Sequence, residues 1–175
     1  MTASAYLVVT VIGDDRPGLV EAIAETIAAH EGNWLESRLS HLAGKFAGVL
    51  RVAVPYARTE ALREALERLS ARGLTVVAEA GATAAARFRE VRMEVLGADH
   101  PGIVRDISTA LARRQVNVEE LDTECFDAPM SGQTMFRATA RLHLPMAVSL
   151  EELRTDLEAV AHDLVVEVSL AELRP

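Results

Sequence analysis

A short motif of glycine, aspartate and proline occurs twice in this chain of 175 residues. Residues 12–20 read Ile-Gly-Asp-Asp-Arg-Pro-Gly-Leu-Val, and residues 96–104 read Leu-Gly-Ala-Asp-His-Pro-Gly-Ile-Val. At the same offset of 84 positions, Asn33 corresponds to Asn117. The chain therefore uses one domain-sized unit twice, rather than the shorter repeat of a solenoid.

Each copy of the motif carries groups that suit the two charges of a free amino acid. If Pro-Gly opens a helix, the unpaired N–H groups of the first turn and the helix dipole favour a carboxylate. Asp15 or Asp99 either caps that helix or faces an ammonium group. Asn33 and Asn117 offer both a donor and an acceptor.

The alternative is that the motif is only a favourable turn between a strand and a helix. On this interpretation Gly13 and Gly97 supply positive φ at a sharp turn. The motif prolines occupy the first helical position, and Gly18 and Gly102 follow inside the first turn. The motif lacks the glycine spacing of dinucleotide-binding loops and the lysine of a P-loop.

Hydrophobic periodicity predicts the elements that position the two motifs. Strands are predicted at residues 6–12 and 91–96, and both motifs lead into amphipathic helices with apolar residues at helical spacing. A hairpin and a second helix follow in each unit. The predicted order is β-α-β-β-α-β, a ferredoxin-like α+β fold with an antiparallel sheet and both helices on one face.

Turn and cap signals mark the ends of these elements. The first hairpin is predicted to turn at residues 43–45, and the second carries an inserted loop at residues 127–132. Ser149 and Glu152 form the pattern of a capping box. Last strands are predicted at residues 74–79 and 164–170. The small, uncharged segment 80–86 is the predicted linker between domains 1–83 and 84–175.

Composition narrows the possible functions. The net charge of −8 repels phosphate backbones, so no direct nucleic acid binding is expected. The single Cys125 excludes an intrachain disulfide and fits a cytoplasmic location. No apolar run is long enough for a membrane span, and no secretory signal is visible.

The chemistry-bearing residues outside the motif do not predict an enzyme. The five histidines are scattered without metal-ligand spacing, so no metal, cofactor or catalytic residue is expected. Cys125 is interpreted as a strand residue that packs as a small hydrophobe. The acidic stretch 119–127 faces a row of Arg137, Thr139, Arg141 and His143 on the return strand. That row either pairs with the acidic residues across the hairpin or docks a partner, and the sequence leaves both open.

Both halves resemble ACT domains, small regulatory modules that bind amino acids. The Asp-x-Pro-Gly-Leu/Ile-Val turn with an asparagine fifteen residues after its glycine carries the resemblance, which covers nearly the whole chain. Two units without an attached enzyme look most like the glycine cleavage system transcriptional repressor group. The resemblance implies ligand contacts at Gly13, Asp15, Pro17, Gly18, Leu19 and Asn33, and at Asp99, His100, Pro101, Gly102, Ile103 and Asn117.

The resemblance also implies how the protein acts. It predicts a non-catalytic regulator that senses a small amino acid, glycine or serine, and contacts a transcription factor rather than DNA. The alternative is an adaptor whose units only mediate protein association. Because His100 replaces Arg16 and Val118 replaces Trp34, the two sites are expected to differ. Uncovered sheet surface at residues 6–12 and at Leu50, Val52 and Val54 predicts packing between copies and a homodimer.

Overall fold

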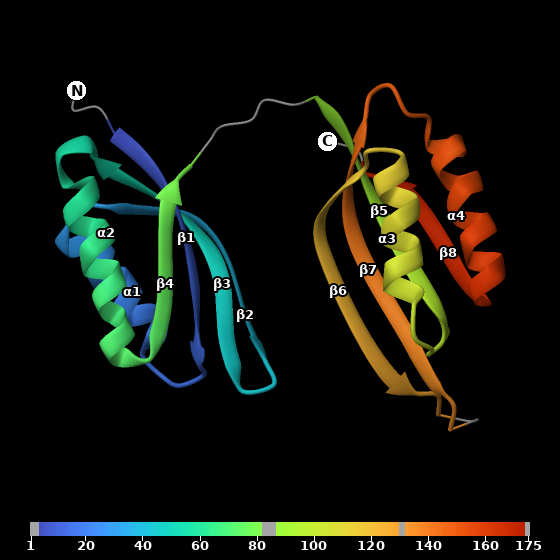
Figure 1. The fold of residues 1–175 in the computed structure, drawn as a ribbon, viewed down its shortest axis with the longest axis horizontal. Coiled ribbons are helices and arrows are strands. Elements are labelled where there is room, and N and C mark those ends of the chain that lie inside the picture. Colours follow the sequence, from blue (N-terminus) through green and yellow to red (C-terminus); the bar gives the residue numbers. More distant parts are fainter. Residues whose placement is uncertain (1–3, 82–86, 130–131, 174–175) are drawn as a thin grey trace. The chain divides into compact units, whose positions relative to one another are not determined.

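The computed structural model describes residues 4–81, 87–129 and 132–173. The chain divides into two compact units, residues 1–84 and 85–175 (Figure 1). The predicted domain boundary between residues 83 and 84 lies outside the described residues. So does most of the predicted linker, although its first residue, Ala80, still belongs to a strand.

The first unit contains the predicted β-α-β-β-α-β order. Its sheet has the strand order β2-β3-β1-β4, and each neighbouring pair is antiparallel. Two short 3-10 segments, Tyr56–Arg58 and Arg68–Arg72, flank the second helix. The elements are β1 (Ser4–Asp14), α1 (Leu19–Ala29), β2 (Asn33–Leu42), β3 (Lys45–Pro55), α2 (Thr59–Glu67) and β4 (Leu74–Ala80).

The second unit repeats this topology with the strand order β6-β7-β5-β8. Its last strand begins later than predicted, because the helix before it continues to Leu164 and Val165 then adopts a left-handed conformation. The elements are β5 (Phe88–Ala98), α3 (Ile103–Arg113), β6 (Asn117–Asp127), β7 (Thr134–Pro145), α4 (Leu150–Leu164) and β8 (Val166–Glu172).

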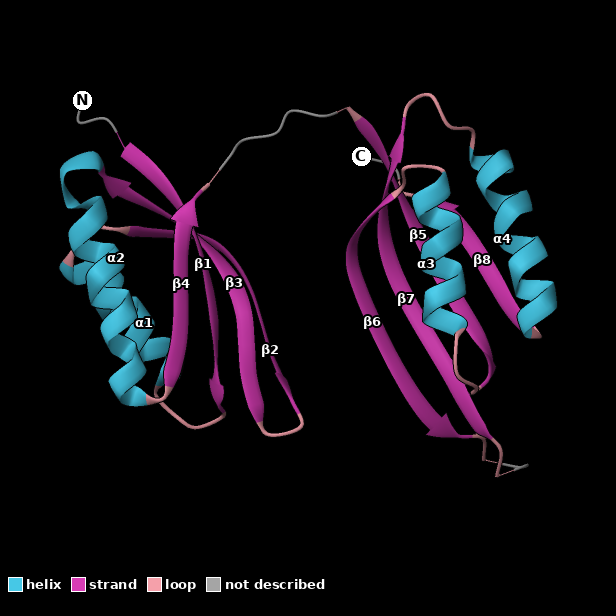
Figure 2. Cartoon of the chain, in the orientation of Figure 1, coloured by secondary structure: helices cyan, strands magenta, loops and turns pink. Residues whose placement is uncertain are grey.

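Each unit packs both helices on one face of its sheet (Figure 2) and has its own apolar core. The helical stripes and the alternating strand residues meet there, as the periodicity predicts. Leu50, Val52 and Val54 are part of this core, so the prediction that they form an uncovered surface is wrong. The exposed apolar residues of the first sheet are on its other face and include Tyr6, Ile12, Val49 and Val77.

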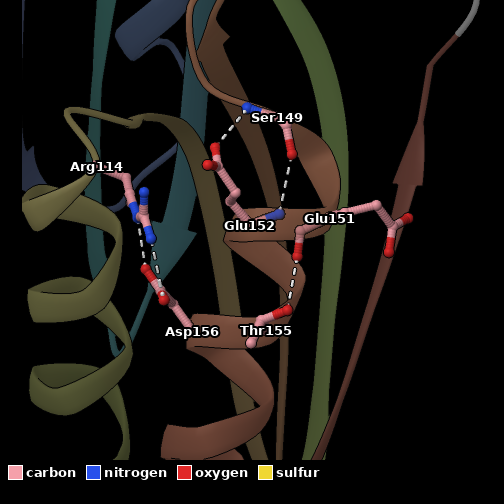
Figure 3. Close-up of polar contacts among 6 residues, drawn as sticks. All are labelled: Arg114, Ser149, Glu151, Glu152, Thr155 and Asp156. Atoms are coloured by element: carbon pink, nitrogen blue, oxygen red, sulfur yellow. Dashed lines mark hydrogen bonds and ion pairs between the residues drawn. The ribbon is translucent and has the colours of Figure 1, made fainter.

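Caps and ion pairs fix the helices of the second unit (Figure 3). The Ser149 Oγ accepts from the Glu152 N–H (3.1 Å) and the Glu152 Oε2 accepts from the Ser149 N–H (3.2 Å), which confirms the capping box. Arg114, the C-cap of α3, pairs with Asp156 on α4, with Nε–Oδ2 and Nη2–Oδ1 distances of 2.6 and 3.2 Å. This bidentate pair holds the two helices at a fixed separation.

The two hairpins differ as predicted. The first turns at Ala43 and Gly44, both with positive φ, which suits the twist of a tight hairpin. The second is longer, and residues 130–131 of its predicted inserted loop lie outside the described residues. None of the described helices combines the length and apolarity needed to cross a membrane.

The acidic and basic rows of the second hairpin pair across the strands. Arg137 Nη1 lies 2.7 Å from Glu124 Oε1, and Arg141 Nη2 lies 3.1 Å from Glu120 Oε1. His143 Nδ1 lies 3.1 Å from Glu119 Oε2. The cross-strand interpretation of these rows is therefore confirmed.

Candidate functional site

The two motif loops start their helices with a glycine in the left-handed region. Gly18 has φ 90° and Gly102 has φ 110°, and each is the N-cap of its helix. The helices begin two residues later than predicted, at Leu19 and Ile103, so the prolines precede the helix instead of opening it. A side chain at either glycine would be strained, because L residues rarely adopt this conformation.

No side chain caps α1 or α3. The prediction that Asp15 or Asp99 caps the helix is therefore wrong. The first backbone bonds of the two helices are Ala22 N–H to Gly18 O and Asp106 N–H to Gly102 O, both 3.0 Å. The N–H groups before them point out of the helix at the positive end of its dipole and can donate to an anion.

Gly13 and Gly97 are required for close approach between strands, and neither has the positive φ that was predicted. A Cβ on Gly13 would lie 2.5 Å from Gly73 O, and a Cβ on Gly97 would lie 2.6 Å from Val166 Cγ1. Both glycines thus let the first strand of each unit contact the start of the last strand. A side chain at either position would thus disturb the pairing of these strands, and the ligand contact predicted for Gly13 stays a prediction.

Arg16 and His100 anchor the two loops to the end of the second helical segment of their units. Arg16 Nη2 donates to Arg72 O, at the end of the 3-10 segment that follows α2. His100 Nε2 lies 2.8 Å from Leu164 O at the end of α4, and its Nδ1 lies 3.3 Å from Pro101 O. These hydrogen bonds raise the pKa of His100 above its ordinary value because they favour the protonated ring, and the bond to Leu164 O has the largest effect.

Asp15 and Asp99 point toward the end of the second strand of their units. Their backbone N–H groups donate to Gly44 O and Thr134 O, both at 2.9 Å, which ties each loop to the neighbouring hairpin. The Asp15 Oδ2 lies 3.8 Å from His41 Nε2.

Cys125 occupies the position equivalent to His41. It is exposed, so the prediction that it packs as a small hydrophobe is wrong. Partial desolvation and the neighbouring Asp99 carboxylate raise the pKa of the Cys125 thiol. A raised pKa leaves less of the thiol as the reactive thiolate.

In neither unit does the motif asparagine lie near the motif loop of the same unit. The whole of α1, 11 residues long, lies between Gly18 and Asn33, and α3 separates Gly102 from Asn117 in the same way. A helix of that length spans about 16 Å. The Asn117 amide instead lies 3.4 Å from Glu119 Oε2. The spacing of fifteen residues does not by itself give this distance, because two residues fifteen apart can be close in space or at opposite ends of a helix.

Leu19 and Ile103 are core residues, so only their backbone groups can face a ligand. The charges around the two loops also differ. Beside Gly18 the nearest side chain is that of Glu21, 3.8 Å from a Cβ placed there. Beside Gly102 it is that of Arg105, which is paired with Asp106 at 2.7 and 3.0 Å.

These charges distinguish the two copies chemically. The first loop has Asp14, paired with Lys45, and Arg16. The second has Arg105, paired with Asp106, and His100, whose pKa is raised. Each loop therefore has both acidic and basic neighbours, and the two differ in which side chains supply the charges. No group of metal-ligating side chains occurs within residues 4–81, 87–129 and 132–173.

Comparison with known proteins is consistent with this picture. Residues 5–79 match the model of the ACT domain family. Over 98% of this chain and 100% of the other, the structure is similar to that of an unknown protein from Galdieria sulphuraria, with 29% identity and a TM-score of 0.85. No curated protein sequence matches the chain.

A second solved structure also matches both units. It is a candidate glycine cleavage system transcriptional repressor with 19% identity and a TM-score of 0.73, and the match covers 98% of this chain and 99% of the other. At that identity the likeness establishes a shared fold across both units.

Proposed function

Since this chain is an ACT domain protein, we propose that it is a non-catalytic regulator that senses a small amino acid. One observation carries the proposal: both units start their first helix at a positive-φ glycine, without a side-chain cap. By contrast α2, which also has no side-chain cap, starts at the right-handed residue Arg58, and α4 has a full capping box. The two helix starts thus leave donors available in the same place, where a ligand carboxylate is stabilised.

The second loop is the proposed binding site. The carboxylate accepts from the backbone N–H groups at residues 103–105, and the Arg105 guanidinium adds positive charge beside it. Asp99 is positioned to receive the ammonium group. A Cβ on Gly102 would lie 3.2 Å from Arg105 Nη2, the end of an exposed side chain that can reach a ligand at the loop. Glycine or serine is the proposed effector, and the likeness to a candidate glycine cleavage system transcriptional repressor supports this choice.

A second copy of the chain supplies the asparagine in this proposal. Within one unit α3 separates Asn117 from the loop by about 16 Å, too far for a molecule the size of glycine to bridge. A two-fold dimer presents each loop to the same surface of its partner. Effector binding then stabilises one arrangement of the two copies. The effector thereby changes the affinity of the dimer for another protein.

The downstream partner in this proposal is a protein, with a transcription factor as the first candidate. The net charge of −8 disfavours direct contact with DNA. The likeness to a candidate glycine cleavage system transcriptional repressor supports this choice of partner.

Calorimetric titration of the purified chain against the twenty amino acids tests the proposal. Glycine or serine should release heat, and Asp99→Asn should weaken binding at least tenfold, because the ammonium group loses its counter-charge. Asp15→Asn in the first loop is the matched control and should bind nearly as well as the original chain. No heat with any amino acid would contradict the proposal.

The alternative function is an adaptor that binds proteins without an effector. It is favoured by the apolar open face of the first sheet, where Tyr6, Ile12 and Val77 are each about half exposed. Light scattering separates the two functions. An adaptor forms the same assembly with and without glycine, whereas a sensor changes its assembly or its affinity for the partner.

A further inference from the structure

The open face of the first sheet is apolar along its centre. Both helices cover the other face (Figure 2), and side chains alternate between the two faces along each strand. Four apolar side chains of the open face are between 45% and 51% exposed: Tyr6 and Ile12 of β1, Val49 of β3 and Val77 of β4. A group of this kind on one face is typical of a surface that binds another protein.

The strand register places two opposite charges on this face, one on each side of β1. Val8 pairs with Arg51 of β3 on one side and with Glu79 of β4 on the other, so the three residues form one row across the sheet. Arg51 has one partner in its own sheet, Glu36, with an Nη2–Oε2 distance of 3.6 Å. Its guanidinium has five N–H donors and can pair with a second carboxylate. Glu79 is in no ion pair among the residues that the structure describes.

A two-fold axis parallel to β1 makes this face complementary to itself. Two sheets that pack face to face lie about 10 Å apart with their strands nearly aligned. The axis places β3 of one copy over β4 of the other and keeps each row at the same level. Arg51 then meets Glu79 of the second copy, and in the next row Val49 meets Val77 of the second copy. Symmetry repeats each contact.

The sheet of the second unit does not offer this match. Its central strand β5 has Arg92 and Glu94 on the open face, and the two side chains pair at 2.9 Å. They are at the positions equivalent to Val8 and Thr10. The same two-fold packing would place each charge over its own copy, which is destabilising. This face is also a poor cover for the apolar one, because its charges would lose water without gaining partners.

We propose that the open face of the first unit binds the same face of a second copy of this chain, about a two-fold axis parallel to β1. Tyr6 and Ile12 lie along the axis, where each meets the same residue of the second copy. The two contacts between Arg51 and Glu79 close the sides of the interface. The effector has no part in this contact, so the inference goes beyond the proposed function.

Light scattering of the full chain over a range of concentrations tests the charge contacts. Arg51→Glu and Glu79→Arg should each weaken the dimer by about tenfold, because like charges then meet at both contacts. A dimer of one Arg51→Glu chain and one Glu79→Arg chain joins opposite charges at both contacts. An equal mixture of the two variants should therefore associate about as tightly as the original chain. A mixture that associates no better than either variant alone would overturn the proposal.

A charge on the axis tests the apolar centre. Ile12→Asp should abolish the dimer, because two carboxylates would meet without a partner. Leu96→Asp, at the equivalent position of the second unit, is the matched control and should leave the dimer unchanged. Ile12 and Leu96 are 49% and 38% exposed, so neither substitution places a charge in a core. An original chain that is monomeric at about 0.1 mM, or a dimer that survives Ile12→Asp, would contradict this interface.

Discussion

Arg16 and His100 anchor equivalent loops by the same contact, a hydrogen bond to a carbonyl at the end of the second helical segment. Arg16 donates to Arg72 O, and His100 Nε2 lies 2.8 Å from Leu164 O. The C-terminal end of a helix favours a cation. Arginine keeps its charge at every physiological pH, whereas histidine titrates, so only the second loop has an anchor that depends on pH.

The second loop should therefore loosen as the pH rises. The pKa of His100 is raised in the folded protein, and the charges around the ring are those of Asp99 and Asp106, with Arg105 paired to Asp106. A raised pKa stabilises the fold fully below the ordinary value of 6.5, and this contribution is lost as the pH rises through the folded-state pKa. Hydrogen exchange at residues 164–166, measured against pH, should show faster opening above that pKa.

Exchanging the two anchors provides the control for this prediction. His100→Arg should remove the pH dependence at residues 164–166. Arg16→His should introduce a similar dependence at residues 72–74 of the first unit. An NMR titration of His100 that gives a pKa at or below 6.5 would contradict the assignment of its two hydrogen bonds.

Alanine at the helix-start glycines should destabilise the fold. Gly18 and Gly102 have φ of 90° and 110°, where an alanine costs about 1–2 kcal/mol in the free energy of unfolding. Gly18→Asn and Gly102→Asn should cost less than the alanine variants, because asparagine tolerates the left-handed region. Urea denaturation measures the difference, and equal stability of the alanine variants would show that the loops relax to another conformation.

The repeat makes the architecture predictable from sequence. Strand alternation, helical stripes and the Ser149 capping box each depend on residues close in the chain, and the structure confirms them. Details that depend on distant contacts were missed. Gly13 is needed because Gly73 O approaches it, and Leu50 is buried because helices cover that face. Neither contact leaves a local signal.

The candidate site was predictable only in part. The motif identifies the helix start, because a Pro-Gly pair between a strand and an amphipathic stretch is typical of the turn before a helix. The anchoring role of His100 depends on Leu164, 64 residues later, and was not predicted. The distance between Gly102 and Asn117 follows from the length of α3, and the number of residues between them does not predict it on its own.

Replacing Val165 by glycine should stabilise the second unit. Val165 has φ 55° and is 81% exposed, so it is a β-branched residue in a strained conformation with little burial in return. The equivalent turn of the first unit uses Gly73, with φ 70°. Val165→Gly should raise the free energy of unfolding by about 1 kcal/mol. Gly73→Val is the reciprocal control and should lower it by a similar amount or more.

Complementation between two inactive variants should show whether the effector site is shared between copies. Asp99→Asn removes the proposed counter-charge for the ammonium group, and Asn117→Ala removes an amide, which weakens binding by about 1–3 kcal/mol. If one copy supplies Asp99 and the other supplies Asn117, a dimer of the two variants contains one intact site. Random mixing makes about half of the dimers hybrids, so about a quarter of all sites should recover. Calorimetry with glycine on the mixed sample measures that fraction. Full loss in the mixture, with dimers present by light scattering, would show that each site is built from a single copy.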